Sequence, residues 1–187
     1  MKSPFYFIVE PVEGKRYNNT KNISGLDFIT STSEEDFTVS NRKGKVKEVP
    51  LNYQGPIKIG DILLVHHNVF KYYNDMKGRQ KSGKSFFKDN LFFIDNDQFF
   101  MYNQNNQWYS HDRYCFVKPI KKQKSFMFKR GKEEPLMGEM VFTNDYLLSQ
   151  GIKPGAQVSF QPDSEYEFDV DGEKLYRMYD HQITMTI

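Results

Sequence analysis

The chain has 187 residues but only one cysteine, Cys115, and one tryptophan. A single cysteine cannot form an internal disulfide, and it supplies too few thiolates for a cysteine-based zinc site. Long apolar segments are also missing: no stretch approaches the roughly 18 residues of a membrane-spanning helix. The first ten residues lack the apolar core of a secretory signal. We therefore expect an unsecreted, cytoplasmic protein with no membrane partner.

Net charge is small as well, because 26 Lys and Arg residues stand against 24 Asp and Glu residues. This balance argues against a protein whose whole surface binds nucleic acid or acidic lipid. Aromatic residues are abundant at 16%, and large rings suit the half-buried surfaces of β-sheets. A chain of this length can bury a substantial core. We therefore expect an all-β protein of one or two small domains.

Four short blocks occur twice in the same order, which is typical of a tandem duplication. Val9-Glu10-Pro11 resembles Val117-Lys118-Pro119 at an offset of 108, Gly44-Lys45-Val46 resembles Gly138-Glu139-Met140 at 94, residues 57–61 resemble 152–156 at 95, and residues 100–112 resemble 168–180 at 68. The offset between the copies falls from 108 to 94 between the first and second blocks, so the first copy is 14 residues longer there. This difference indicates a long polar loop at 17–41 in the first copy. The decrease from 95 to 68 places an insert near residues 72–98.

Local signals predict short strands joined by tight turns. Asp171-Gly172 is typical of a two-residue hairpin turn, which requires positive φ at both positions. The one helix-like segment is 144–150, where Asn144 would cap a single turn. We expect two small β-barrels, at residues 1–115 and 116–187, with the loop and an inserted β-hairpin in the first.

The order of these motifs resembles the GroES-type co-chaperonins, present here as two tandem copies. In that family a Val-x-Pro step ends the first strand, a Gly-x-Val strand follows the loop, and an Ile-Lys-x-Gly-Asp turn enters the next apolar strand. The matching residues in the first copy are Val9-Glu10-Pro11, Gly44-Lys45-Val46 and Ile57-Lys58-Ile59-Gly60-Asp61. The resemblance implies a homo-oligomer that caps or modulates a chaperonin, the large ATPase ring that folds other proteins.

The same resemblance implies that a mobile loop after the first strand docks on the chaperonin. The matching residues are Gly25, Leu26, Phe28 and Ile29, within a polar segment that cannot bury enough apolar area to order itself. Leu26 and Phe28 alternate, so both would point to one side of an extended segment. Asp27 departs from the all-apolar tripeptide of the family. The alternative interpretation is an edge strand whose Leu26 and Phe28 pack on the barrel.

Residues 78–85 match the phosphate-loop pattern G-x-x-x-x-G-K-[ST], with Lys84 and Ser85 as its last positions. A phosphate loop must lie between a buried strand and a helix N-terminus. Residues 86–95 instead predict a turn and a strand. We therefore expect a basic hairpin tip at 78–85 that does not bind nucleotide, with flanks 70–73 and 91–94 paired across it. Its lysines and rings also fit single-stranded nucleic acid, but a solvated hairpin is the preferred interpretation.

Candidate catalytic and metal sites are weak. Cys115 is centred in a predicted strand with no base nearby in the sequence, and His66 and His67 would face opposite sides of a strand. We expect no catalytic residues, no metal and no cofactor, and hence a binding protein rather than an enzyme. An Asn- and Lys-rich composition also fits a viral protein, which would act in the host cytoplasm. The alternative function is a structural or adaptor protein of a virus particle that reuses the same scaffold.

Overall fold

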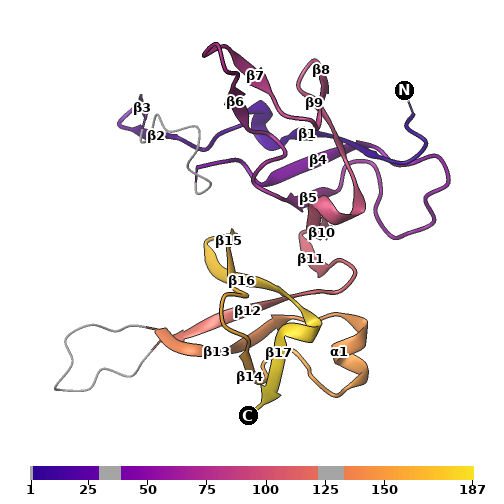
Figure 1. The fold of residues 1–187 in the computed structure, drawn as a ribbon, viewed down its shortest axis with the longest axis vertical. Coiled ribbons are helices and arrows are strands. Elements are labelled where there is room, and N and C mark those ends of the chain that lie inside the picture. The colour runs from indigo at the N-terminus through magenta and orange to yellow at the C-terminus, as the bar shows by residue number, and fades with distance from the viewer. Residues whose placement is uncertain (1, 30–38, 122–132) are drawn as a thin grey trace. The chain divides into compact units, whose positions relative to one another are not determined.

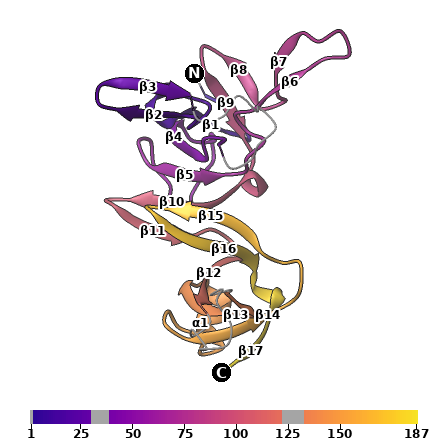
Figure 2. The same cartoon turned by 90° about the vertical axis from the view of Figure 1, so that its left-hand side faces the viewer.

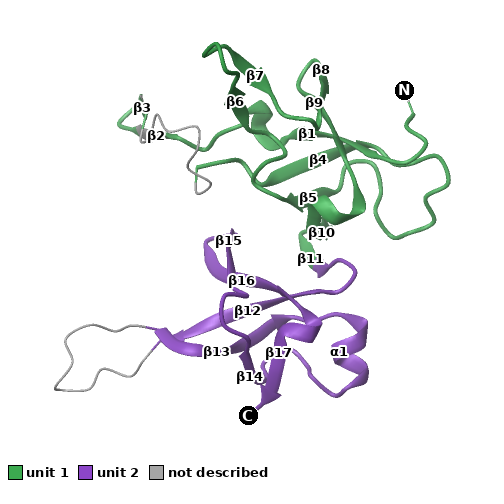
Figure 3. Ribbon diagram, in the orientation of Figure 1, with its two compact units in different colours: residues 1–108 green, residues 109–187 purple. Residues whose placement is uncertain are grey.

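The computed structural model describes residues 2–29, 39–121 and 133–187. The chain divides into two compact units, residues 1–108 and 109–187 (Figure 3). Apart from 3-10 turns, the described elements are β-strands and one short helix, α1 (Asp145–Ser149), so the all-β class is confirmed. The boundary predicted between 115 and 116 falls inside β12 (Tyr114–Lys121), which lies wholly in the second unit.

The first unit contains a seven-stranded sheet with the order β11-β10-β5-β4-β1-β9-β8 (Figure 1). In chain order its strands are β1 (Phe7–Pro11), β4 (Lys43–Glu48), β5 (Ile62–Val65), β8 (Phe86–Lys88), β9 (Leu91–Ile94), β10 (Phe99–Gln104) and β11 (Gln107–Ser110). The last two residues of β11 lie beyond the boundary, in the second unit. Two separate hairpins are formed by β2 (Thr20–Ile23) with β3 (Leu26–Ile29) and by β6 (Tyr72–Asn74) with β7 (Gln80–Ser82). Short 3-10 turns are η1 (Val12–Gly14) and η2 (Asn96–Gln98).

The second unit contains a six-stranded sheet with the order β15-β16-β12-β13-β14-β17. Besides β12, its strands are β13 (Glu133–Phe142), β14 (Gln157–Phe160), β15 (Tyr166–Val170), β16 (Glu173–Tyr179) and β17 (Ile183–Thr186), with the 3-10 turn η3 (Asp180–Gln182) before β17. Both sheets are open, because their outermost strands each pair with one neighbour. The described strands therefore do not close into the predicted barrels.

The two sheets pair their strands in the same register. β4 lies between β1 and β5, and β13 lies between β12 and β14. Residue pairs correspond at offsets of 108, 94 and 95: Val9–Val46 and Val117–Met140, Pro11–Gly44 and Pro119–Gly138, Gly44–Leu63 and Gly138–Val158. Each first strand even shifts register at the same place, after Ile8 and after Phe116. These are the first three offsets predicted from the sequence.

The fourth predicted offset, 68, is wrong. Val9 also pairs with Phe92, and Val117 also pairs with Tyr176, so β16 corresponds to β9 at an offset of 84. Hairpin β15–β16 consequently corresponds to β8–β9, and β17 corresponds to β10. The sequence comparison selected residues 100–112 because β9 and β10 are both short aromatic runs that follow a turn. Only their different partners in the sheet distinguish them.

The predicted insert, 72–98, contains two hairpins rather than one. β6–β7 turns at residues 75–79, where Gly78 has a φ of 72°. β8–β9 turns at Asp89 and Asn90, and β9 joins the main sheet beside β1. Residues 91–94 therefore pair with β1 and β8 instead of with residues 70–73. Within the described part of the chain, only β6–β7 of these two hairpins has no counterpart in the second unit.

Each unit has its own apolar core, built from equivalent strand positions. Buried pairs at the offsets above are Phe7 and Cys115, Val9 and Val117, Val46 and Met140, Leu63 and Val158, and Ile94 and Met178. The duplication thus keeps which positions face inward while changing the side chains that fill them. No helix in the described residues is long and apolar enough to cross a membrane.

Candidate functional site

Strands β2 and β3 form a hairpin within the predicted docking loop. Figure 1 shows it projecting away from the main sheet of the first unit, and Figure 2 views the chain from the side on which it projects. Its turn consists of Ser24 and Gly25, whose φ angles are 54° and 86°. Positive φ at both central positions is characteristic of a type I′ turn, which matches the twist of the flanking strands. Gly25 therefore shapes the hairpin through its backbone conformation.

One face of this hairpin, which we call the apolar face, carries Ile23, Leu26 and Phe28. Ile23 pairs with Leu26 across the strands, and Phe28 lies two residues further along β3. Cross-strand partners and alternate residues share a side of a sheet. The exposed fractions of these side chains are 56%, 65% and 49%. Exposed apolar side chains that converge in this way are typical of interaction surfaces.

The apolar face differs from the sequence prediction in two residues. Ile29 pairs with Thr20 and lies on the opposite side of the hairpin from Leu26 and Phe28. Ile23 was not predicted, although the Ser24-Gly25 turn signal would have placed it opposite Leu26. The alternative interpretation, in which Leu26 and Phe28 pack on a barrel, is wrong because both are exposed on a separate two-stranded sheet.

Hydrogen bonds join the two ends of the predicted loop, residues 12–18 and 39–41, which we call the loop root. The buried Asn41 side chain donates to the carbonyl oxygens of Val12 and Lys15, at 2.9 and 2.7 Å. The backbone N–H of Asn41 donates to Arg16 O, and that of Asn18 donates to Val39 O. The middle of the predicted loop, residues 30–38, lies outside the described residues.

Arg16, at the same root, contacts both hairpins that follow β5. Its guanidinium carbon lies 4.1 Å from the ring centre of Tyr72 and 4.8 Å from that of Phe92. It donates to Ser82 Oγ at 2.8 Å and to Asn90 Oδ1 at 3.3 Å. Burial lowers the pKa of Arg16 from its ordinary value, but a guanidinium stays charged in proteins. Cation–π contacts and hydrogen bonds therefore fasten the loop root to β6–β7 and β8–β9.

Tyr17 adds a second connection between the loop root and the β6–β7 hairpin. Its hydroxyl accepts a hydrogen bond from the backbone N–H of Tyr72 at 2.8 Å, and the two rings stack with centroids 6.2 Å apart. Tyr72 is thus held between Arg16 and Tyr17. Among the described residues, β6–β7 has no counterpart in the second unit, and together with β8–β9 it contacts the root of the loop.

The phosphate-loop pattern does not adopt phosphate-loop geometry. Residues 78–85 run through the end of the β6–β7 turn, strand β7 and a short connection, and strand β8 follows instead of a helix. The backbone carbonyl of Ser85 accepts a hydrogen bond from Phe93 N–H at 2.6 Å, which ties it to β9. The helix N-terminus that a phosphate loop requires is therefore replaced by sheet.

The remaining chemically notable side chains take structural positions. Cys115 is fully buried and donates to Met178 O at 3.6 Å, and burial raises its pKa to about 12. Its thiol is therefore protonated at neutral pH, unlike a nucleophilic thiolate. His66 and His67 follow β5, and their side chains do not face opposite sides as the sequence predicts. The centroids of their rings lie 4.2 Å apart. Among the described residues, no group of three His, Cys, Asp or Glu side chains could hold a metal ion.

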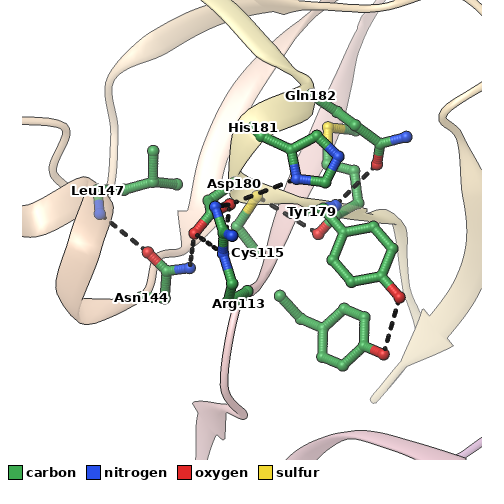
Figure 4. A network of polar contacts seen from close by, with 10 residues as sticks. Arg113, Cys115, Asn144, Leu147, Tyr179, Asp180, His181 and Gln182 are labelled. Atoms are coloured by element: carbon green, nitrogen blue, oxygen red, sulfur yellow. Dashed lines mark hydrogen bonds and ion pairs between the residues drawn. The ribbon is translucent and has the colours of Figure 1, made fainter. Parts of the chain in front are cut away.

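A buried polar network in the second unit is centred on Asp180, whose side chain is fully buried (Figure 4). Arg113 donates to both carboxylate oxygens, with its Nη2 2.7 Å from Oδ1. Asn144 donates to Oδ2 at 3.1 Å and accepts from Leu147 N–H at the start of α1, the predicted cap. Burial alone would raise the pKa of Asp180, but the hydrogen bonds from Arg113 and Asn144 outweigh it, so this pKa is lowered. The network joins β12, α1 and η3.

Comparison with known proteins adds no assignment. No protein-family model matches the chain, and a search of curated proteins finds no match.

Proposed function

We propose that this protein is a co-chaperonin-like binding protein, built from two tandem GroES-like domains, that docks on a chaperonin through the apolar face of hairpin β2–β3. The observation that carries the proposal is the exposed cluster of Ile23, Leu26 and Phe28 on a hairpin after the first strand. This is the place where the resemblance puts the docking loop. Binding to an assembly of several subunits would fit a homo-oligomer.

The pairing of the motif residues is the second support. Each of the two units pairs the last residue of its Val-x-Pro step with the glycine of its Gly-x-Val or Gly-x-Met strand. The strand after the Ile-Lys-x-Gly turn pairs with that same glycine strand in both units. The motifs used for the resemblance are thus neighbours in space as well as in sequence order.

The apolar face has the chemistry for a weak, repeated contact. Burying one Leu- or Phe-sized side chain contributes about 1.5–3 kcal/mol, so three partly exposed side chains give modest affinity per copy. Several copies in one oligomer would bind a multi-subunit partner together, and such multivalency raises avidity without new contacts. A surface of this kind allows release as well as capture.

The test is co-sedimentation of the purified protein with a chaperonin ring in the presence and absence of ATP. We expect nucleotide-dependent binding by the wild type, weakened at least tenfold in Leu26→Glu/Phe28→Glu, because both changes place charge where apolar contact is needed. The matched control is Leu51→Glu/Ile59→Glu. These residues are similarly exposed, at 56% and 61%, but lie elsewhere in the first unit. The control should bind like the wild type.

Two results would overturn the proposal. One is the absence of wild-type binding to the chaperonin in any nucleotide state. The other is a monomeric mass in light scattering together with incorporation into virus particles at fixed stoichiometry, which would instead support the adaptor function.

A further inference from the structure

A pocket of about 490 Å³ lies at the foot of the β6–β7 hairpin, away from the apolar face. Lys71, Tyr72 and Tyr73 line it from the start of β6, and Lys84 lines it from the connection between β7 and β8. Asn68 and Gln98, which carry amide side chains, also line the pocket. Its volume falls in the range of about 300–1,000 Å³ that is usual for small-molecule sites.

The lining of this pocket carries positive charge only. Its nine lining residues include Lys71 and Lys84 but no Asp or Glu. Asp75, which follows the lining residue Asn74, lies 3.3 Å from Lys81. Such a site favours an anion.

The pocket also offers an aromatic surface. Tyr73 is 51% exposed, and Tyr72 is fixed in place by Arg16 and Tyr17. Planar bases stack on tyrosine rings beside lysines in proteins that bind single-stranded nucleic acid. Two lysines and the exposed Tyr73 around one pocket therefore match a ligand that is anionic at one end and planar at the other.

We propose that this pocket binds a nucleotide, with a phosphate group between Lys71 and Lys84 and the base against Tyr73. Lys84 belongs to the sequence pattern of a phosphate loop, but here it acts as a cation on a β-hairpin connection, and no hydrolysis is involved. The proposal thus departs from the expectation that residues 78–85 bind no nucleotide. A free nucleotide and a nucleotide within a single strand present the same chemistry. The site is independent of chaperonin docking, because it shares no residue with the apolar face.

The first experiment measures binding of ATP without magnesium, and of an oligonucleotide of eight thymidines, by fluorescence anisotropy at about 50 mM salt. Wild-type protein should bind at least one of them with a dissociation constant below about 1 mM. Lys71→Gln/Lys84→Gln should weaken binding tenfold or more, since charge-assisted contacts to phosphate are lost. The matched control, Lys77→Gln/Arg79→Gln, removes the same charge from the hairpin turn and should weaken binding less than threefold.

The exposed Lys84 is also tested alone as Lys84→Gln, which keeps the proposal testable if the double variant does not fold. The base is tested with Tyr73→Ala and Tyr73→Phe. The alanine variant should lose roughly fivefold or more of the affinity, and the phenylalanine variant should keep it. Tighter binding of the oligonucleotide than of ATP identifies a strand as the ligand, and the reverse identifies a free nucleotide.

Three outcomes overturn the inference. They are no wild-type binding to either probe, equal weakening by the pocket and control variants, and competition by inorganic phosphate as strong as that by ATP. The last would leave no role for the base. Because chaperonin co-sedimentation is a separate measurement on the same proteins, failure here and failure of the proposed function are distinguishable.

Discussion

The two units pair their strands in one register but differ in what they attach to it. In the first unit, the connection after β5 contains the additional β6–β7 hairpin, which holds the loop root through Arg16. The second unit carries α1 between β13 and β14, where the first has an irregular segment between β4 and β5. The two units thus share backbone pairing, which many residues determine together, while their connections differ because connections lie at the surface.

The largest difference should appear at the equivalent glycines Gly138 and Gly44. A Cβ at Gly138 would lie 2.2 Å from Val117 Cγ1 and 2.7 Å from the backbone oxygen of Lys118, whereas one at Gly44 would lie 3.2 Å from its nearest side-chain atoms. Gly138→Ala should therefore lower the free energy of unfolding by about 3 kcal/mol or more, and Gly44→Ala by about 1 kcal/mol. Urea denaturation measures both. Equal losses of unfolding free energy would mean that β1 packs against β4 as tightly as β12 packs against β13.

The next comparison concerns Asp180 and its equivalent Asn96, at the offset of 84. Asp180 is buried within its hydrogen-bond network, and Asn96 is exposed. Asp180→Ala should cost about 2–4 kcal/mol of unfolding free energy because the buried Asn144 amide loses its acceptor and Arg113 loses its side-chain partner. Asn96→Ala should stay within about 0.5 kcal/mol. A small effect of Asp180→Ala in thermal and urea denaturation would show that the network does not stabilise the second unit.

The smallest expected effect is a pH dependence confined to the first unit. His67 has a folded pKa of about 4 against an ordinary value of 6.5, and its equivalent in the second unit is Pro162. The unfolded state therefore takes up the proton first as pH falls. The stabilising effect of neutral His67 is complete above about pH 6.5 and declines toward pH 4, by about 1 kcal/mol after solvent screening.

This dependence is measured by urea denaturation at pH 7.5 and 4.5. His67→Gln should remove about 1 kcal/mol of the difference between the two conditions. His181→Gln, in the second unit, should leave the dependence of the first unit unchanged. An identical pH response of wild type and His67→Gln would contradict the assigned pKa.

Local features of the sequence determined much of this structure. The turn at Asp171 and Gly172 has φ angles of 54° and 85°, as predicted, and Asn144 caps the single α-helical turn. Three of the four repeat offsets recur in the strand pairing. These features depend on a few neighbouring residues, whose backbone preferences and side-chain hydrogen bonds act over short distances.

The tertiary structure decided which strands meet and which side chains are buried. The sequence predicts that residues 91–94 pair with residues 70–73, but in the structure they form β9 and pair with β1. Asp180 is buried by contacts with Arg113 and Asn144, which lie 67 and 36 residues away in the sequence. The pocket at the foot of the β6–β7 hairpin likewise combines residues of β6 with Lys84. Such arrangements minimise the free energy of the whole sheet and its core, so no local pattern specifies them.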